Sequence, residues 1–292
     1  MVGVIVVTKY IIKNIHLRLM LIEKSVDVVK EHSEILSIPL NRNVRIDFYA
    51  TLSAGYYDKV KLLLVNDGQD LEKMNFEQIL LQSEQESSLV PIIVAAIHCG
   101  TDRIQEYGTA AIADFKERGS RAGAYQDFIL NELIPFITEK YHEKQIESIS
   151  FAGFSLGGLS AIDIVWNNPA IFDMSGIFSA SLWWRSKDHH DKSFNPLTDR
   201  IMHAQIRNGE YIPGKRFFFQ TGELDEIADR NNNGVIDSID DTIDLMRELL
   251  AKGYKEGEEM IYYQMTDGKH DVDTWAKAFP VFLQWGFGKK FL

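Results

Sequence analysis

IESISFAGFSLGGLSAIDIVW, residues 146–166, is the stretch that decides the fold class of this chain. Residues 146–152 have the composition of a short buried strand, and residues 159–166 carry apolar side chains at helical spacing. Between them, residues 153–157 (GFSLG) form a complete G-x-S-x-G. On a sharp strand-to-helix turn this pattern strains the serine backbone and needs small flanking residues. The sequence therefore predicts that Ser155 stands clear of a sheet as a nucleophile; the alternative is a glycine-rich turn with a solvated serine.

Strand and helix signals alternate through the rest of the chain, which predicts an α/β fold with a mostly parallel sheet. The expected elements are a hairpin within 33–52 that turns at 41–43, strands at 59–71, 91–100, 173–178, 216–221 and 260–265, and helices at 76–85, 125–141, 242–252 and 274–287. Pro135 marks a kink or boundary inside one helix. Residues 31–292 are expected to form a single domain, with residues 1–30 as an N-terminal extension of uncertain order.

Composition narrows the classes of function. The 292 residues are 45% hydrophobic and 25% charged, as in ordinary globular proteins. A net charge of −11 argues against a nucleic-acid partner. Cys99 is the only cysteine, so no intrachain disulfide can form. Residues 1–24 are too interrupted by basic side chains for a secretory signal, and no apolar run approaches the ~20 residues of a membrane span. We therefore expect a cytoplasmic protein that does not enter a membrane.

A serine nucleophile needs an imidazole base, and the imidazole needs an acid to orient it. His270 directly follows the last expected strand and precedes the final helix, where the base of a serine-acid-histidine order belongs. The loop after strand 216–221 offers Asp225, which we favour as the acid by its distance from the strand, and Glu226 as the second choice. The other downstream histidines are expected in a solvated loop (His189, His190) or on a helix (His203).

Two backbone N–H groups should stabilise the negative oxygen of the reacting carbonyl. One is expected from Leu156, the residue after the nucleophile. The other is expected from the turn after strand 59–66, where Gly68 lets the backbone bend inward, and Gln69 is our choice for the donor.

These stretches resemble the putative-esterase branch of the α/β-hydrolases, which includes enterochelin esterases and feruloyl and acetyl-xylan esterases. The resemblance rests on LLLVNDGQD, IHCGTDRIQEYG, FAGFSLGGLSA, NNPAIFDMSGIFSASLWW, FFFQTGELDE and GKHDVDTWAKAFPVFLQW, in that order over about residues 35–287. It implies an α/β-hydrolase fold, with the nucleophile at Ser155, the base at His270 and the acid at Asp225.

The resemblance also implies which residues surround the substrate. Trp183 and Trp184 would stand near the acyl or leaving-group pocket, and Arg103 and Tyr107 would border the site. One departure is the Asn-Asp-Gly turn at 66–68, where many feruloyl esterases have His-Gly; it leaves the second oxyanion donor and the substrate class open.

Residues 229–240 (DRNNNGVIDSID) match the spacing of a calcium loop. Oxygen side chains occupy positions one, three, five, nine and twelve, glycine is sixth, and the seventh residue supplies its carbonyl. The ligand set would be Asp229, Asn231, Asn233, Val235 (carbonyl), Asp237 and Asp240. Aspartate at position twelve is shorter than the usual glutamate. The loop begins four residues beyond Asp225, so we expect bound Ca²⁺ to brace the acid-bearing turn; the alternative is an asparagine-rich turn without metal.

The leading hypothesis is a serine esterase that acts on a small ester, aromatic or sugar-bearing, without a catalytic cofactor. A serine peptidase or acyltransferase could use the same triad. A calcium-dependent binding protein that does not turn over substrate is the alternative from another class. Neither the natural substrate nor the oligomeric state follows from the residues.

Overall fold

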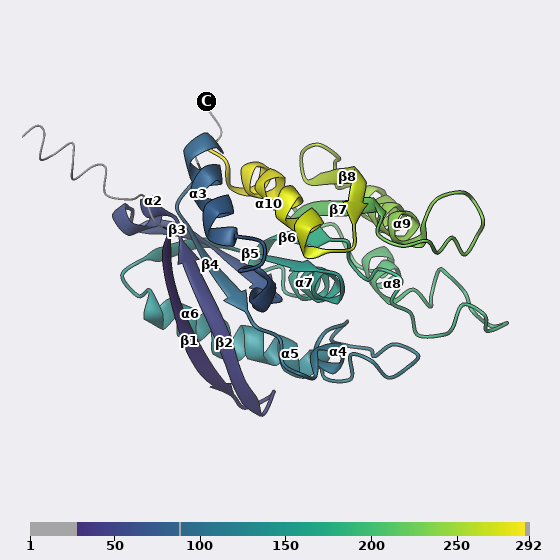
Figure 1. The fold of residues 1–292 in the computed structure, drawn as a ribbon. Helices are drawn as coiled ribbons and strands as arrows, with labels where there is room; N and C mark the ends of the chain where they lie inside the picture. The colour runs from purple at the N-terminus through teal and green to yellow at the C-terminus, as the bar shows by residue number, and fades with distance from the viewer. Residues whose placement is uncertain (1–27, 88, 290–292) are drawn as a thin grey trace, which may run out of the picture.

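The computed structural model describes residues 28–87 and 89–289, and one sheet with helices on both faces forms its centre (Figure 1). The sheet has eight strands in the order β1-β2-β4-β3-β5-β6-β7-β8. β1 pairs antiparallel with β2 and β2 antiparallel with β4, whereas all remaining neighbours are parallel. The predicted α/β architecture with a mostly parallel sheet is therefore confirmed.

The bounds of the elements follow the predicted pattern closely. The strands are β1 (Val29–Ser37), β2 (Arg42–Ala50), β3 (Lys59–Asn66), β4 (Ile92–Ile97), β5 (Gln145–Phe154), β6 (Phe172–Phe178), β7 (Arg216–Leu224) and β8 (Met260–Lys269). The helices are α2 (Leu52–Tyr56), α3 (Phe76–Ser87), α4 (Arg103–Glu106), α5 (Ala122–Phe128), α6 (Ile134–Lys140), α7 (Leu156–Asn167), α8 (Ile201–Asn208), α9 (Asp237–Lys252) and α10 (Val272–Phe287), with a 3-10 helix η1 (Gly68–Asp70) and a π-helix η2 (Ile129–Leu133). Residues 1–27 of the expected extension lie outside the described residues, and β1 already includes Lys30.

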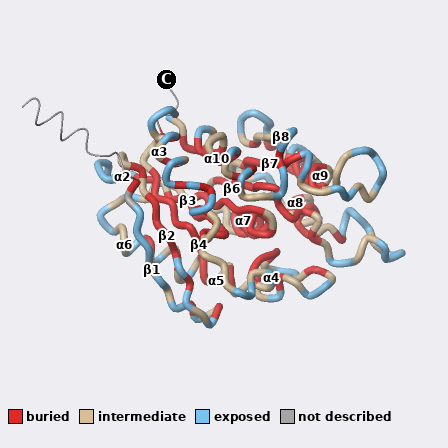
Figure 2. The backbone as a smooth tube through the Cα atoms, viewed as in Figure 1, coloured by how far each residue is buried: buried red, intermediate tan, exposed pale blue. Residues whose placement is uncertain are grey.

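Two apolar cores pack against opposite faces of the sheet. On β3, Leu62 and Leu64 join the core with α5, α6 and α7, while Leu63 and Val65 join the core with α3 and α10. Since successive side chains of a strand point to opposite faces, a strand covered on both sides needs an uninterrupted apolar run. Figure 2 shows these central strands as buried and the surrounding loops as exposed. Burial of each such side chain contributes about 2 kcal/mol.

The helix predicted over 125–141 is divided rather than simply kinked. α5 passes into the π-helix η2, and α6 begins at Ile134 with Pro135 in its first turn. Proline lacks a backbone N–H and its ring crowds the preceding turn, so the wider π turn absorbs the disruption.

β7 and β8 run further than the predicted 216–221 and 260–265. Their extension depends on close backbone contact, because a Cβ on Gly222 would lie 2.3 Å from the carbonyl oxygen of Gly268. Leu224 pairs with Lys269 at the end of this extension. The two strands therefore deliver the next residues, Asp225 and His270, side by side.

Candidate active site

Ser155 occupies a strained turn between β5 and α7. Its backbone has φ 54° and ψ −123°, a positive φ that is rare for a residue with a side chain. A Cβ on Gly153 would lie 2.3 Å from the carbonyl oxygen of Gly157, so only glycine fits there. The Ser155 N–H donates to the carbonyl of Phe178 at 2.9 Å, which fixes the turn to β6. The hydroxyl is thereby presented at the carboxyl edge of the sheet.

The His270 imidazole meets this hydroxyl directly. Its Nε2 lies 2.9 Å from Ser155 Oγ. Its ring packs edge-on against Trp275 with centroids 5.3 Å apart, and Asp271 caps α10 by accepting the Thr274 N–H at 2.9 Å. Desolvation lowers the pKa of His270, and the charge of Asp225 partly opposes that shift. The imidazole is therefore neutral at neutral pH and can accept the serine proton.

Asp225 directly follows β7 and lies beside His270. Both residues line a cavity next to Ser155. One carboxylate oxygen accepts the Gly222 N–H at 3.1 Å, whereas the other, Oδ1, is buried without a hydrogen-bond partner among the described residues. Burial raises the pKa of Asp225, while the Gly222 N–H, the nearby Ser179 side chain and, after them, the positive form of His270 lower it. The unpaired oxygen is an acceptor available to an imidazole N–H. Glu226, the second choice, lines the same cavity.

The turn after β3 faces the nucleophile across the start of α7. Asp67 adopts a left-handed conformation with φ 59° and ψ 44°. The Asn66 amide donates to the Gly157 carbonyl at 2.7 Å and ties this turn to the first turn of α7. Among the described residues, neither the Leu156 nor the Gln69 backbone N–H has a backbone acceptor outside regular structure. Both predicted donors are therefore free to bind another oxygen.

The aromatic and basic residues implied by the resemblance form two layers. Arg103 holds the Asp67 carboxylate through two nitrogens, each at 2.7 Å, and lies 5.0 Å above the Tyr107 ring. Tyr107 itself is fully buried, and its hydroxyl accepts the Asp67 N–H at 3.3 Å. Trp183 lines the cavity, whereas Trp184 is fully buried behind it. In the pair Arg103 and Tyr107, the buried member is Tyr107; in the pair Trp183 and Trp184, the buried member is Trp184.

A cavity of about 320 Å³ opens beside the nucleophile and the base. Sequence reasoning missed three of its lining residues, Ser179, Ser181 and Ser238. The first two directly follow β6, so the rule that ligands bind at the carboxyl ends of parallel strands could have identified them. Ser238 is the second residue of α9, and no local pattern marks it.

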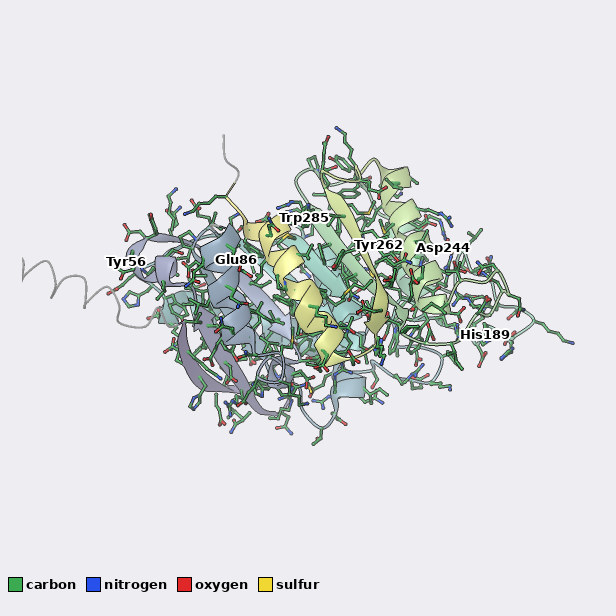
Figure 3. The ribbon with its side chains drawn as sticks, turned by 45° about the horizontal axis from the view of Figure 1, so that its top comes forward. Tyr56, Glu86, His189, Asp244, Tyr262 and Trp285 are labelled. Carbon is green, nitrogen blue, oxygen red and sulfur yellow. The ribbon has the colours of Figure 1, made fainter. Side chains whose placement is uncertain are left out.

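The remaining histidines serve other purposes. His203 is buried on α8, its Nε2 lies 2.8 Å from the Asp241 carbonyl oxygen, and burial lowers its pKa to about 3. His189 and His190 lie with Asp188 in the loop between β6 and α8, at the far end of the molecule (Figure 3). Their ligand atoms lie within 4.8 Å of one another, and neither they nor Asp188 line the cavity at Ser155.

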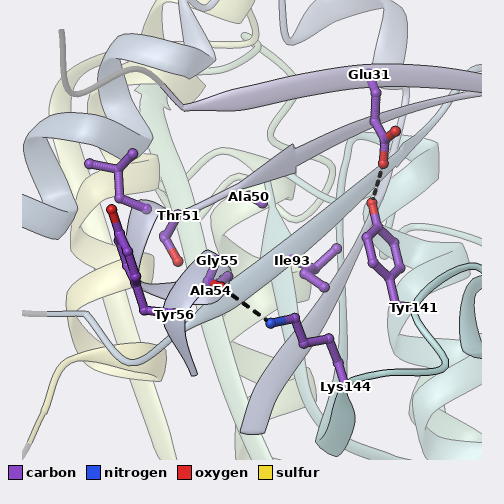
Figure 4. A pocket seen from close by; sticks show the side chains of 10 residues that line it. Glu31, Ala50, Thr51, Ala54, Gly55, Tyr56, Ile93, Tyr141 and Lys144 are labelled. Carbon is purple, nitrogen blue, oxygen red and sulfur yellow. Dashed lines mark hydrogen bonds between the residues drawn. The ribbon is translucent and has the colours of Figure 1, made fainter. Parts of the chain in front are cut away.

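A second cavity, of about 340 Å³, lies at the opposite edge of the sheet (Figure 4). Its wall is mostly apolar and includes Ala50, Tyr56 and Ile93. The polar groups there are satisfied within the protein: Tyr141 donates to Glu31 at 2.6 Å, and Lys144 donates to the Tyr57 carbonyl at 3.1 Å. None of its lining residues places a nucleophile beside a base, whereas Ser155 and His270 meet at the first cavity.

The predicted calcium loop is held together by hydrogen bonds among its own residues. The Asp229 carboxylate accepts the N–H groups of Asn233 at 3.1 Å and Gly234 at 2.9 Å. The side-chain amides of Asn231 and Asn233 both donate to one oxygen of Asp240, at 2.9 and 2.7 Å. Val235 and Asp237 complete the predicted set, with Asp237 at the start of α9. In this arrangement the amides of Asn231 and Asn233 present nitrogen to Asp240, so the calcium site stays a prediction.

Comparisons with known proteins add a family to this geometry. A sequence model of the family described as "Putative esterase" matches residues 38–285. The chain belongs to this family. The family resemblance identified from the sequence motifs is therefore confirmed. A Bacillus subtilis (strain 168) protein named "Uncharacterized protein YbbA" is 29% identical over 160 residues, which cover 52% of this chain and 62% of that protein.

Solved structures show the α/β-hydrolase fold that was predicted. The enterobactin esterase FES from Shigella flexneri, solved in the presence of enterobactin, matches with a TM-score of 0.67 at 18% identity, covering 89% of this chain and 59% of that one. The siderophore hydrolase EstB from Aspergillus nidulans matches with a TM-score of 0.63 at 17% identity, covering 89% and 97%. This chain thus spans about three fifths of the length of its Bacillus and Shigella relatives.

Within the described residues, no helix combines the length and the apolar character that crossing a membrane requires. The cytoplasmic location stays a prediction.

Proposed function

We propose that this esterase hydrolyses a carboxylic ester through an acyl-enzyme on Ser155, with His270 as base and Asp225 as the acid. The observation that carries the proposal is the 2.9 Å contact between His270 Nε2 and Ser155 Oγ at a turn with positive φ. A serine that is strained, presented at a strand end and paired with a neutral imidazole has the geometry of an activated nucleophile.

In the first half of the reaction, Ser155 Oγ attacks the ester carbonyl carbon while His270 takes the hydroxyl proton. The carbonyl oxygen becomes negative and accepts the N–H groups of Leu156 and Gln69. His270 then gives its proton to the alcohol oxygen, and the carbon–oxygen bond to the alcohol breaks. The second half repeats these steps with water as the nucleophile, which releases the acid and regenerates Ser155.

Asp225 supports this cycle through the imidazole. When His270 becomes positive, its second nitrogen needs an acceptor, and Asp225, whose charge raises the pKa of His270 and whose Oδ1 has no partner among the described residues, would supply it. The carboxylate then stabilises the cation and holds one tautomer.

We also propose that the 229–240 loop binds a structural Ca²⁺. Rotating the amide groups of Asn231 and Asn233 would turn their oxygens, instead of their nitrogens, toward Asp240. Asp237 would have to share its carboxylate with Arg230, whose backbone N–H it accepts at 2.9 Å. The carbonyl of Val235 and the Asp229 carboxylate complete the oxygen set. The ion would restrain the segment that begins four residues after Asp225 and would take no part in the chemistry.

The substrate is proposed to be a small ester. Trp183 gives the cavity one aromatic wall, which suits an aromatic or a cyclic substituent. The relatives described as an enterobactin esterase and a siderophore hydrolase act, by those descriptions, on small-molecule ligands.

Covalent labelling tests the mechanism. A fluorophosphonate should add one phosphonyl group to Ser155, as located by peptide mass spectrometry, and Ser155→Ala should abolish both the adduct and p-nitrophenyl acetate hydrolysis. Ser193→Ala, which changes an exposed loop serine, should do neither. Folded wild-type protein that stays unlabelled would contradict the proposal. Faster turnover of matched amides than of esters would favour a peptidase.

A further inference from the structure

The cavity at Ser155 lies on one defined side of the nucleophile. Its walls come from the carboxyl ends of β5, β6, β7 and β8 and from the start of α9. The oxyanion turn follows β3, on the other side of β5. His270, which must protonate the departing alcohol, lines the cavity itself. The part of the ester that fills the cavity is therefore the alcohol.

A carboxylate without a counter-ion stands in this cavity. Glu226 is half-buried, and no described residue forms a salt bridge with it. Burial, followed by the charges of nearby Asp237, Asp241 and Asp225, raises its pKa, while a hydrogen bond from the Ser238 N–H opposes that shift. Asp237 and Asp241 are ion-paired with Arg230, and Asp241 also with Arg200, which leaves Asp225 as the neighbouring carboxylate without a basic partner among the described residues.

Several other carboxylates of this chain have a basic partner. Asp67, Glu106, Asp114 and Asp241 are buried, and each is paired with an arginine. An uncompensated buried charge is costly, and these four carboxylates are neutralised within the protein. Glu226 is only half-buried and, like the fully buried Asp163, has no basic partner among the described residues; unlike Asp163, it lines the cavity at Ser155.

Two further walls of the cavity suit a positive guest. The Ser238 side chain is only 9% exposed, and its Oγ is buried without a partner. Trp183 offers an aromatic surface and is held by Arg118, whose guanidinium lies 4.8 Å from its ring centroid. An ammonium group gains from an aromatic face as well as from a carboxylate. A neutral guest would displace water from Glu226 without supplying the missing charge.

We propose that this cavity binds a cationic, ammonium-bearing alcohol portion of the ester, with Glu226 as its counter-ion and Trp183 and Ser238 as further contacts. The inference rests on the serine esterase mechanism proposed above, and it adds the chemical class of the alcohol. The reaction steps are unchanged: His270 protonates the alcohol oxygen as it leaves. A Ca²⁺ ion in the 229–240 loop would neutralise Asp237 and still leave Glu226 unpaired.

A pair of isosteric esters tests the charge alone. Acetylcholine and 3,3-dimethylbutyl acetate have the same shape, and carbon replaces the quaternary nitrogen in the second. In the calcium-loaded full chain at fixed ionic strength, kcat/KM should be about tenfold higher for the cation. In Glu226→Gln this ratio should fall to about one, whatever happens to both rates together. Glu223→Gln, which removes one exposed charge from the same loop, should keep the wild-type ratio.

The alcohols themselves give a second readout. Choline should inhibit p-nitrophenyl acetate hydrolysis about tenfold more tightly than 3,3-dimethylbutanol. Equal behaviour of each pair, with p-nitrophenyl acetate still hydrolysed, overturns the subsite and leaves the serine mechanism standing. A preference that survives in Glu226→Gln, or faster turnover of glycerol monoacetate than of acetylcholine, also overturns it. Loss of all ester hydrolysis together with an unlabelled Ser155 overturns both proposals.

Discussion

On the oxyanion side of Ser155, Asp67 is held by two nitrogens of Arg103 at 2.7 Å each, whereas on the other side Asp225 keeps a buried oxygen without a partner. The difference extends to the neighbours. Asn66 is hydrogen-bonded to the start of α7, but among the described residues Glu226 has no counter-ion and the Ser238 hydroxyl has no partner.

The contrast separates two tasks within one site. Backbone donors must stand in place before negative charge develops on the carbonyl oxygen, because reorganising them during the reaction would raise the barrier. The acid side must instead accept a charged imidazole and, by our proposal, a charged alcohol. Side chains whose hydrogen-bonding atoms already have partners could not accept the charged imidazole or the charged alcohol. By our proposal, the oxyanion side is therefore complete in the free protein, and the acid side is completed during turnover.

The largest loss of activity should come from removing the His270 imidazole. His270→Ala should lower kcat for p-nitrophenyl acetate about 10⁴-fold, since the base and the acid of the cycle are lost together. Steady-state assays at pH 8 measure it. His142→Ala, at an exposed loop histidine, serves as the control, and a His270→Ala loss below tenfold would exclude the imidazole as base.

On the oxyanion side, the ion pair between Asp67 and Arg103 can be removed by mutation. Asp67→Asn should lower the free energy of unfolding by about 2 kcal/mol, because it leaves the Arg103 guanidinium without its buried partner. Urea denaturation monitored by tryptophan fluorescence would give the value. Asp70→Asn removes a carboxylate from the same turn, but its partner Lys73 is mostly exposed, so the loss should stay below about 0.5 kcal/mol. Equal losses would show that the Asp67 pair is no more important than a surface contact.

The pH dependence can sharpen the description of the acid side. Activity needs neutral His270, so kcat/KM should be full above the imidazole pKa and fall as pH drops through it. Desolvation lowers that pKa from its ordinary value, and Asp225 holds it up in part. Asp225→Asn should therefore move the midpoint of the profile to lower pH while reducing its plateau. An unmoved midpoint in Asp225→Asn, with a moved one in Glu226→Gln, would transfer the role of acid to Glu226.

The smallest effect is expected from the calcium loop. At a free Ca²⁺ concentration ten times the dissociation constant, binding should stabilise the protein by about 1.4 kcal/mol, or about 3 °C in Tm. Differential scanning calorimetry with EDTA and with Ca²⁺ measures the shift. Asp229→Ala should abolish it, whereas Asp188→Ala in the exposed histidine loop should preserve it. A shift that persists in Asp229→Ala would place the ion elsewhere.

Short sequence patterns predicted the parts of this site that are determined by residues close together in the chain. The turn at Ser155 follows from five residues between a strand and a helix. His270 was identifiable because it directly follows the last apolar strand. Apolar periodicity likewise predicted the hairpin, the parallel strands and the helices, because helices cover both faces of the sheet.

Features that depend on distant contacts were not legible. The lengths of β7 and β8 are set by the contact between Gly222 and Gly268, which lie far apart in the chain. Ser238 reaches the cavity only because α9 begins at Asp237, earlier than the apolar pattern starts at residue 242. Tyr107 and Trp184 look like their neighbours in sequence, and only packing decides that they are buried.

The backbone at Ser155 has a consequence for the balance between stability and activity. A positive φ at a residue with a side chain costs of the order of 1–3 kcal/mol, which the folded state bears whether or not substrate is present. Ser155→Ala keeps that strain and Ser155→Gly removes it, although neither can form an acyl-enzyme. The glycine variant should therefore unfold at higher urea concentration than the alanine variant, by about 1 kcal/mol after the greater flexibility of unfolded glycine is counted. Selection for stability alone would replace this serine, so its presence marks a position where the chain is held for chemistry at the expense of its own fold.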